Sequence, residues 1–186
     1  MNNPLRAGEQ VGHFLWVLLH GFAGSGLLHP LTGLDHMMAM IAVGAWSAQL
    51  GGKNIIRVPL GFVTVMCIGG VLGVHSAALP FVETGIVFSV ILLGLAIAAN
   101  RRMAAPLAAL AVGIFGLCHG YAHGREWPHL QQPSLYITGF LVTTATLHVV
   151  GAVGGLLLLE RKDGARALRR AGVFVFLVGV YLLVRP

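Results

Sequence analysis

The chain of 186 residues is 56% hydrophobic and 10% charged, and its formal net charge is +6 at pH 7. This composition is too apolar for an ordinary soluble domain of such a length, so it predicts an integral membrane protein. The basic residues stand in short gaps between apolar runs, where they set membrane topology, and no nucleic acid partner is expected.

The apolar runs predict an all-α fold, a polytopic transmembrane bundle of six or seven helices that forms a single membrane domain over residues 1–186. The first run, at about 12–28, is broken by His20 and three glycines. No small-residue cleavage site follows it, so a retained helix or an interfacial segment is expected rather than a signal peptide. The core helices are expected at about 33–50, 58–79, 82–99, 105–122, 135–159 and 171–184.

The gaps between these runs predict the topology, because lysine and arginine are enriched in cytoplasmic loops. Arg6 and the gaps at about 51–57, 100–104 and 160–170 hold ten of the 12 basic residues. These gaps are therefore expected on the cytoplasmic side of the membrane. The stretches that precede the first core helix and follow the second and fourth are expected on the outer side.

Most histidines and carboxylates fall near the outer ends of the expected helices. Neutral imidazoles and carboxylates are the ligands of borderline divalent metals such as nickel, cobalt, zinc and copper. Polar groups within a membrane are costly, so their presence indicates function. The candidate metal ligands are therefore His29, Asp35, His36, Met40, His75, Glu83, His119 and His123, with His148 deeper along the same axis.

Helical spacing supports two of these groups. His36 and Met40 are four residues apart, so they share a helix face. His119, His123 and Glu126 fall at i, i+4 and i+7 and also present one face. Two histidines one turn apart can share one ion.

Simpler structural roles are open for single members of this set. Thr32 at an N-cap and Asp35 in the first helical turn would suit the positive end of a helix. His75 and His148 each stand alone on an apolar helix, where a histidine is more often an interhelical hydrogen-bonding partner than a ligand. The methionines near His36 suit packing better than ligation.

Several motifs in the chain point to one family. The first is His29-Pro30-x-x-Gly33-x-Asp35-His36-x-x-x-Met40-x-x-Val43-Gly44. The others are Glu83-Thr84-Gly85, His119-Gly120-Tyr121-Ala122-His123-Gly124 followed by Glu126, and His148 with Gly151. Together, over about residues 20–160, they strongly resemble the signature of the HupE/UreJ family of hydrogenase and urease accessory proteins.

The resemblance implies a permease of the bacterial inner membrane, not an enzyme, with its metal motif on the periplasmic side. Such a permease moves Ni²⁺, or Co²⁺ in some members, to supply metalloenzyme assembly. It assigns metal roles to His29, Asp35 and His36, and a less central one to Met40. The ion is expected to be cargo, with no permanently bound cofactor, and Zn²⁺ suits the same ligands. Membrane lipid is an expected partner, and faces of small residues permit a homo-oligomer.

Two other functions fit parts of the pattern. A helical His-x-x-x-His pair with a further histidine and aspartate could hold the zinc of an intramembrane hydrolase, with Ser25 or Ser76 recruited. Paired histidines on different helices could bind the haem of an electron carrier. ATP hydrolysis is not expected, because Gly52-Lys53 lacks the upstream glycine of a P-loop and precedes Asn54.

Overall fold

The computed structural model describes residues 26–75, 79–100, 103–127 and 133–185, without the side chains at positions 105 and 133. The helices in these ranges are the one-turn α2 (His29–Thr32) and six longer ones: α3 (Leu34–Leu50), α4 (Asn54–His75), α5 (Val82–Ala99), α6 (Ala105–Glu126), α7 (Pro133–Leu159) and α8 (Gly164–Val184). The all-α prediction is confirmed. Most of the run expected at 12–28 lies outside the described residues.

The long helices have the length and composition of membrane spans. Among the described residues, the five helices α4 to α8 are long and apolar enough to cross a bilayer. Helix α3 has 17 residues, which at 1.5 Å per residue is about 26 Å, close to the thickness of the hydrocarbon core. Its buried residues Ala39, Met40, Val43 and Trp46 form part of the central core. The expected multi-pass membrane bundle is therefore the observed fold.

Three helices extend beyond the runs expected for them, at the ends that carry charge. The helix expected at 58–79 is α4, which begins at Asn54 and ends at His75. Helix α6 continues to Glu126 rather than 122, and α8 begins at Gly164 rather than 171. Apolar runs mark the part of a helix that lies in hydrocarbon, whereas charged end turns reach the interface and stay helical. These three ends therefore lie outside the approximate bounds expected from the apolar runs.

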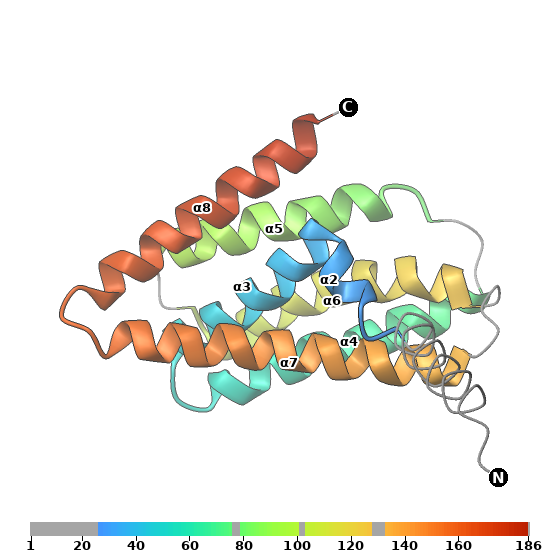
Figure 1. The fold of residues 1–186 in the computed structure, drawn as a ribbon, viewed down its shortest axis with the longest axis horizontal. Helices are drawn as coiled ribbons and strands as arrows, with labels where there is room; N and C mark the ends of the chain where they lie inside the picture. The colour runs from blue at the N-terminus through green and yellow to red at the C-terminus, as the bar shows by residue number, and fades with distance from the viewer. Residues whose placement is uncertain (1–25, 76–78, 101–102, 128–132, 186) are drawn as a thin grey trace, which may run out of the picture.

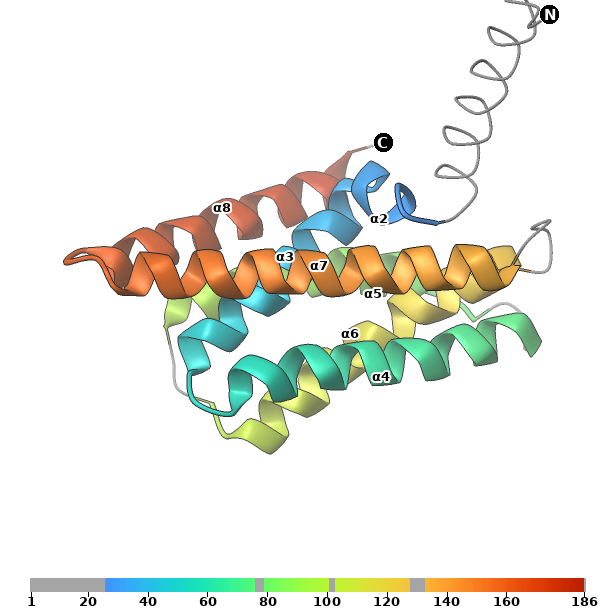
Figure 2. The same ribbon diagram turned by 60° about the horizontal axis from the view of Figure 1, so that its bottom comes forward.

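The helices pack as three close pairs, which are α4 with α6, α5 with α8, and α3 with α7 (Figures 1 and 2). Glycines set the closest crossings. A Cβ at Gly120 would overlap the carbonyl oxygen of Met66, and one at Gly69 would overlap that of Leu117. These small residues bring the backbones of α4 and α6 together.

One end of the bundle gathers segments that are distant in sequence. Helix α2, the last turns of α4 and α6, and the first turns of α3, α5 and α7 lie at this end (Figures 1 and 2). We refer to it as the α2 end. The turn between α3 and α4 and the turn between α7 and α8 lie at the opposite end. The charged residues of those two turns are thus separated from the histidines along the length of the helices.

Candidate metal centre

The site begins with α2, which two contacts hold against α7. The Thr143 hydroxyl donates a hydrogen bond of 2.8 Å to the Leu27 carbonyl. Gly26 has a φ of 71° and lies so close to the Tyr136 carbonyl that no Cβ fits. A positive φ at a close backbone approach is a position for glycine. His29 follows at the start of α2 and is thereby placed beside α7.

The predicted N-cap at Thr32 is wrong. Its hydroxyl donates to the His29 carbonyl at 2.8 Å, inside α2. Gly33 is extended, with φ −90° and ψ 115°, and stands between the two helices as the N-cap of α3 without a side-chain cap. Because the Thr32 hydroxyl makes this local hydrogen bond to a backbone carbonyl, it is not used as a helix cap. The extended glycine separates His29 from His36, so the two residues lie on different helices.

Asp35 orients His36 in the first turn of α3. Its Oδ1 accepts the His36 backbone N–H at 2.8 Å and lies 3.1 Å from Nδ1 of the same imidazole. An anion in a first helical turn is favoured by the helix dipole. A proton on Nδ1 that points to the carboxylate leaves the Nε2 lone pair free for a metal, as in carboxylate–histidine–metal arrangements. Asp35 is therefore placed to orient His36 and to support it as a candidate ligand.

The predicted histidine face of α6 meets His36. His119 and His123 are 0% and 3% exposed, and their ring centroids lie 4.6 Å and 4.5 Å from that of His36. The Nε2 atoms of His123 and His36 are 2.7 Å apart. Metal–nitrogen bonds of about 2.0–2.1 Å place neighbouring ligand atoms roughly 3 Å apart, so a small shift would seat one ion between the two imidazoles.

Ser89 on α5 determines the tautomer of His119. The Ser89 hydroxyl donates its proton to the Ile86 carbonyl at 2.6 Å. Its oxygen lies 3.1 Å from His119 Nε2, so it accepts the Nε2 proton. The lone pair of His119 is then on Nδ1, which is buried and has no hydrogen-bond partner. A buried donor or acceptor without a partner costs about 1–3 kcal/mol, and a bound cation would satisfy it.

His123 also belongs to a second group of possible ligands, besides its contact with His36. His29, His123 and Glu126 each offer a ligand atom, and these atoms all lie within 4.8 Å of one another. Glu126 Oε2 is 3.7 Å from His29 Nε2 and 3.6 Å from His123 Nδ1. The Tyr136 hydroxyl on α7 donates to the same carboxylate oxygen at 3.3 Å. His123 thus faces His36 with one nitrogen and Glu126 with the other.

The entrance to this group is half open to solvent, because the side chains of His29 and Glu126 are 36% and 51% exposed. Burial lowers the pKa of His29, and the Glu126 carboxylate opposes this shift only in part. The lowered pKa favours the neutral imidazole, which is the form that binds a metal. We call His29, Asp35, His36, His119, His123 and Glu126 the histidine cluster.

His148 lies apart from the cluster, on α7. It is 2% exposed, and both ring nitrogens lack a hydrogen-bond partner. A Cβ at Gly44 of α3 would overlap its carbonyl oxygen, so the α3–α7 crossing fixes its position. The interhelical hydrogen bond considered for this residue is absent from the described structure.

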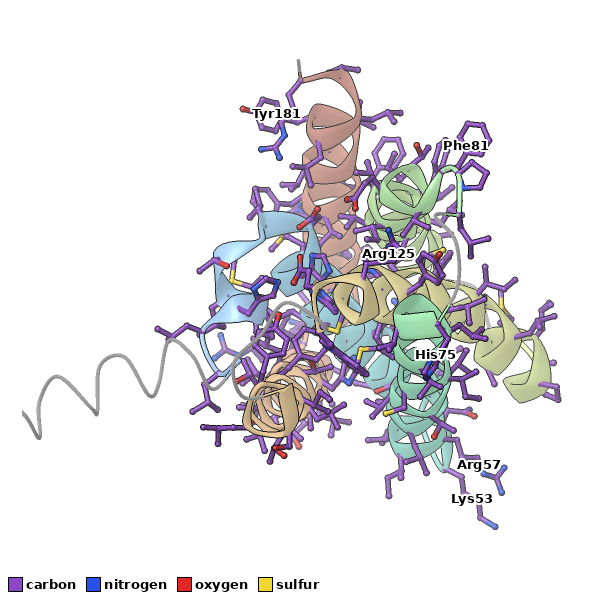
Figure 3. All side chains as sticks on the ribbon, turned by 90° about the vertical axis from the view of Figure 1, so that its right-hand side faces the viewer. Lys53, Arg57, His75, Phe81, Arg125 and Tyr181 are labelled. Atoms are coloured by element: carbon purple, nitrogen blue, oxygen red, sulfur yellow. The ribbon has the colours of Figure 1, made fainter. Side chains whose placement is uncertain are left out.

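Besides His148, three more predicted ligands are not part of the cluster. His75 is exposed at the end of α4, as Figure 3 shows, and Glu83 is exposed in the first turn of α5. Within the described ranges, no hydrogen bond or ion pair joins either to the histidines. Met40 is 1% exposed within the hydrophobic core. Their roles as ligands stay predictions, and the exposed Glu83 lines a separate cavity of about 330 Å³ with Tyr121 and Arg125.

Glu126 was absent from the predicted ligands, although its i+7 spacing from His119 put it on the correct face. The contact between Glu126 and His29 could not be predicted, because it depends on the turn at Gly33 and on the position of α2 beside α7. His129 lies in the range 128–132, outside the described residues.

Comparison with known proteins gives two similarities. A family model described as "HupE / UreJ protein" matches residues 6–182. The chain is also similar to "Protein HupE" of Rhizobium leguminosarum bv. viciae, with 48% identity over 160 residues, which is 86% of this chain and 83% of that protein. No solved structure matches the chain significantly.

Proposed function

The chain belongs to the HupE/UreJ family, and from this premise we propose that it is a permease for Ni²⁺, or Co²⁺, that supplies hydrogenase or urease maturation. The observation that supports the proposal most is the histidine cluster. It brings four imidazoles and two carboxylates from α2, α3 and α6 together at one end of a membrane bundle. Side chains that are so distant in sequence have a clear reason to converge here if they bind one ion together.

The chemistry of the cluster suits capture of a borderline divalent cation. Neutral imidazoles supply most of the donors, and Glu126 supplies a negative charge at the entrance. The partly exposed side chains of His29 and Glu126 would bind the ion first and replace some of its water ligands. The more buried His36, His123 and His119 would then hold the ion. A permease must also release its cargo, and a set of ligands spread along a path favours transfer over a closed cage. We infer that the predicted ligands Met40, His75 and Glu83 do not take part in the capture of the ion at the histidine cluster.

We further infer that the α2 end faces the periplasm of a bacterial inner membrane. This orientation rests on the basic residues of the opposite end, including Lys53 and Arg161. An inside-negative membrane potential of 100 mV favours inward movement by about 2.3 kcal/mol for each elementary charge. For a divalent ion, the contribution is roughly twice as large. Passive inward movement through the protein is then sufficient, and the proposal includes no catalytic step.

The test is uptake of radiolabelled Ni²⁺ into liposomes that contain the purified protein. His36→Ala removes a ligand, and Asp35→Ala removes its supporting carboxylate, so both should lower the initial rate severely. Phe174→Ala is a control, because Phe174 is 60% exposed on α8. Unchanged uptake in folded His36→Ala and Asp35→Ala proteins would refute the proposal. Stoichiometric zinc after purification, together with hydrolytic turnover, would instead support the hydrolase.

A further inference from the structure

One exposed face of α8 changes from basic to apolar along the helix. Arg166 and Arg170 lie one turn apart near the start of α8, and both are exposed. Val173 and Leu177 follow at i+7 and i+11 from Arg166, so they lie on the same face. They are 47% and 57% exposed. We call these four residues the exposed face of α8.

The opposite side of α8 packs closely on α5, which leaves the exposed face directed away from the bundle (Figures 1 and 2). A Cβ at Gly172 would lie 2.5 Å from the backbone nitrogen of Ala98, and one at Gly179 would lie 2.8 Å from that of Ile91. These close approaches fix the rotation of α8 about its axis. In a bilayer, the exposed face therefore contacts lipid.

The arginines at the start of α8 differ in the partners that they have within the protein. Arg169 Nε–H donates to the Ala98 carbonyl at 2.9 Å, at the end of α5. Arg166 pairs with Asp163 Oδ1 at 2.6 Å, but both side chains are exposed, and such a pair contributes little to stability. Arg170 makes no hydrogen bond or ion pair in the described structure. Because a guanidinium has five N–H donors, Arg166 and Arg170 can both bind an anion.

The turn between α7 and α8 adds to the positive charge beside this face. Residues 160–170 include five basic and two acidic side chains. Arg161 and Lys162 are exposed, and the acidic residues that oppose them are Glu160 and Asp163. Clusters of basic residues at the end of a membrane helix attract anionic lipid headgroups, and the planar guanidinium matches the geometry of a phosphate.

We propose that the exposed face of α8 binds an anionic phospholipid in the leaflet opposite the α2 end. Arg166 and Arg170 bind the phosphate, and an acyl chain lies along Val173 and Leu177. The basic turn repels the cationic group of a zwitterionic lipid, so an anionic headgroup is preferred. This lipid site is separate from the histidine cluster and does not depend on the proposed transport function.

The first test measures lipid binding to the purified protein in detergent by native mass spectrometry, with phosphatidylglycerol and with phosphatidylcholine of the same acyl chains. Arg166→Gln/Arg170→Gln should weaken phosphatidylglycerol binding roughly 30-fold, because each basic residue at an anionic surface contributes about 1 kcal/mol. Lys53→Gln/Arg57→Gln is the matched control. It removes the same charge at the same end of the bundle, at the start of α4 (Figure 3), and should leave binding nearly unchanged.

Equal weakening in the two double variants, or equal binding of the two lipids by the native protein, would overturn the site. Melting temperatures of the variants without lipid verify that the fold is kept.

A second test uses the ion pair at the start of α8. Asp163→Asn leaves the Arg166 guanidinium without its carboxylate partner, so phosphatidylglycerol should bind several-fold more tightly. Unchanged or weaker binding would contradict a role for Arg166. An excess of inorganic phosphate should not displace the lipid, because it lacks an acyl chain. Displacement would show a site for free phosphate and overturn the lipid assignment. Nickel uptake by the same double variants separates the two proposals, since lipid binding is measured without nickel.

Discussion

The histidines of the cluster have polar partners, whereas His148 is a buried histidine without a hydrogen bond in the described structure. In the cluster, Asp35 faces His36, Ser89 faces His119, and Glu126 faces both His29 and His123. His148 is 2% exposed, makes no hydrogen bond in the described structure, contacts the ring of Phe62 and lines an otherwise apolar cavity. Oriented imidazoles that lie close together can hold an ion jointly. Under the proposed function, the cluster therefore captures the ion, and His148 does not take part in its capture.

Both regions depend on glycine crossings, but on different ones. The α4–α6 crossing at Gly120 carries His119 and His123 on either side of the contact, while the α3–α7 crossing at Gly44 carries His148. The two environments can therefore be disturbed separately.

The largest effect is expected from Gly120→Leu. Overpacking a tight core costs about 1–3 kcal/mol or more, and here the new side chain would meet the Met66 backbone, which cannot rotate away. We expect a strongly lowered melting temperature in detergent and loss of nickel binding. Gly154→Leu is the matched control, because nothing lies within 4 Å of a Cβ at that α7 glycine. Equal melting temperatures for the two variants would contradict the close α4–α6 crossing.

The comparison between the regions is tested by His123→Ala and His148→Ala in equilibrium nickel titrations. His123 contacts both halves of the cluster, so its loss should weaken binding by more than the roughly 10–100-fold that accompanies loss of a supporting partner. His148→Ala should leave the affinity nearly unchanged. Equal losses of affinity in both variants would show that His148 takes part in the capture.

The sequence predicted most of this arrangement. The spacing of His119 and His123 and the pair Asp35–His36 were sufficient to identify the buried faces that meet, because helical periodicity is a local property. The place of His29 was not predictable in the same way, since it depends on the break at Gly33 and on contacts of residues 26 and 27 with α7.

The smallest effect is expected from Tyr136→Phe. This change removes the hydroxyl that donates to Glu126 Oε2 at 3.3 Å and keeps the ring that stacks on Phe140. A typical hydrogen bond contributes about 0.5–1.5 kcal/mol, so nickel affinity should fall by roughly 2- to 10-fold. Flux measured at saturating nickel should stay close to native. A loss as large as that of His123→Ala would mean that Tyr136 is itself a ligand.

The most direct test of the account is nickel X-ray absorption on the purified protein loaded with one equivalent of Ni²⁺. The account predicts nitrogen and oxygen ligands with the multiple-scattering pattern of several imidazoles. That pattern should weaken in His123→Ala and stay the same in His148→Ala. A spectrum without imidazole ligands, or one dominated by sulfur, would contradict the assignment of the histidine cluster as the metal centre.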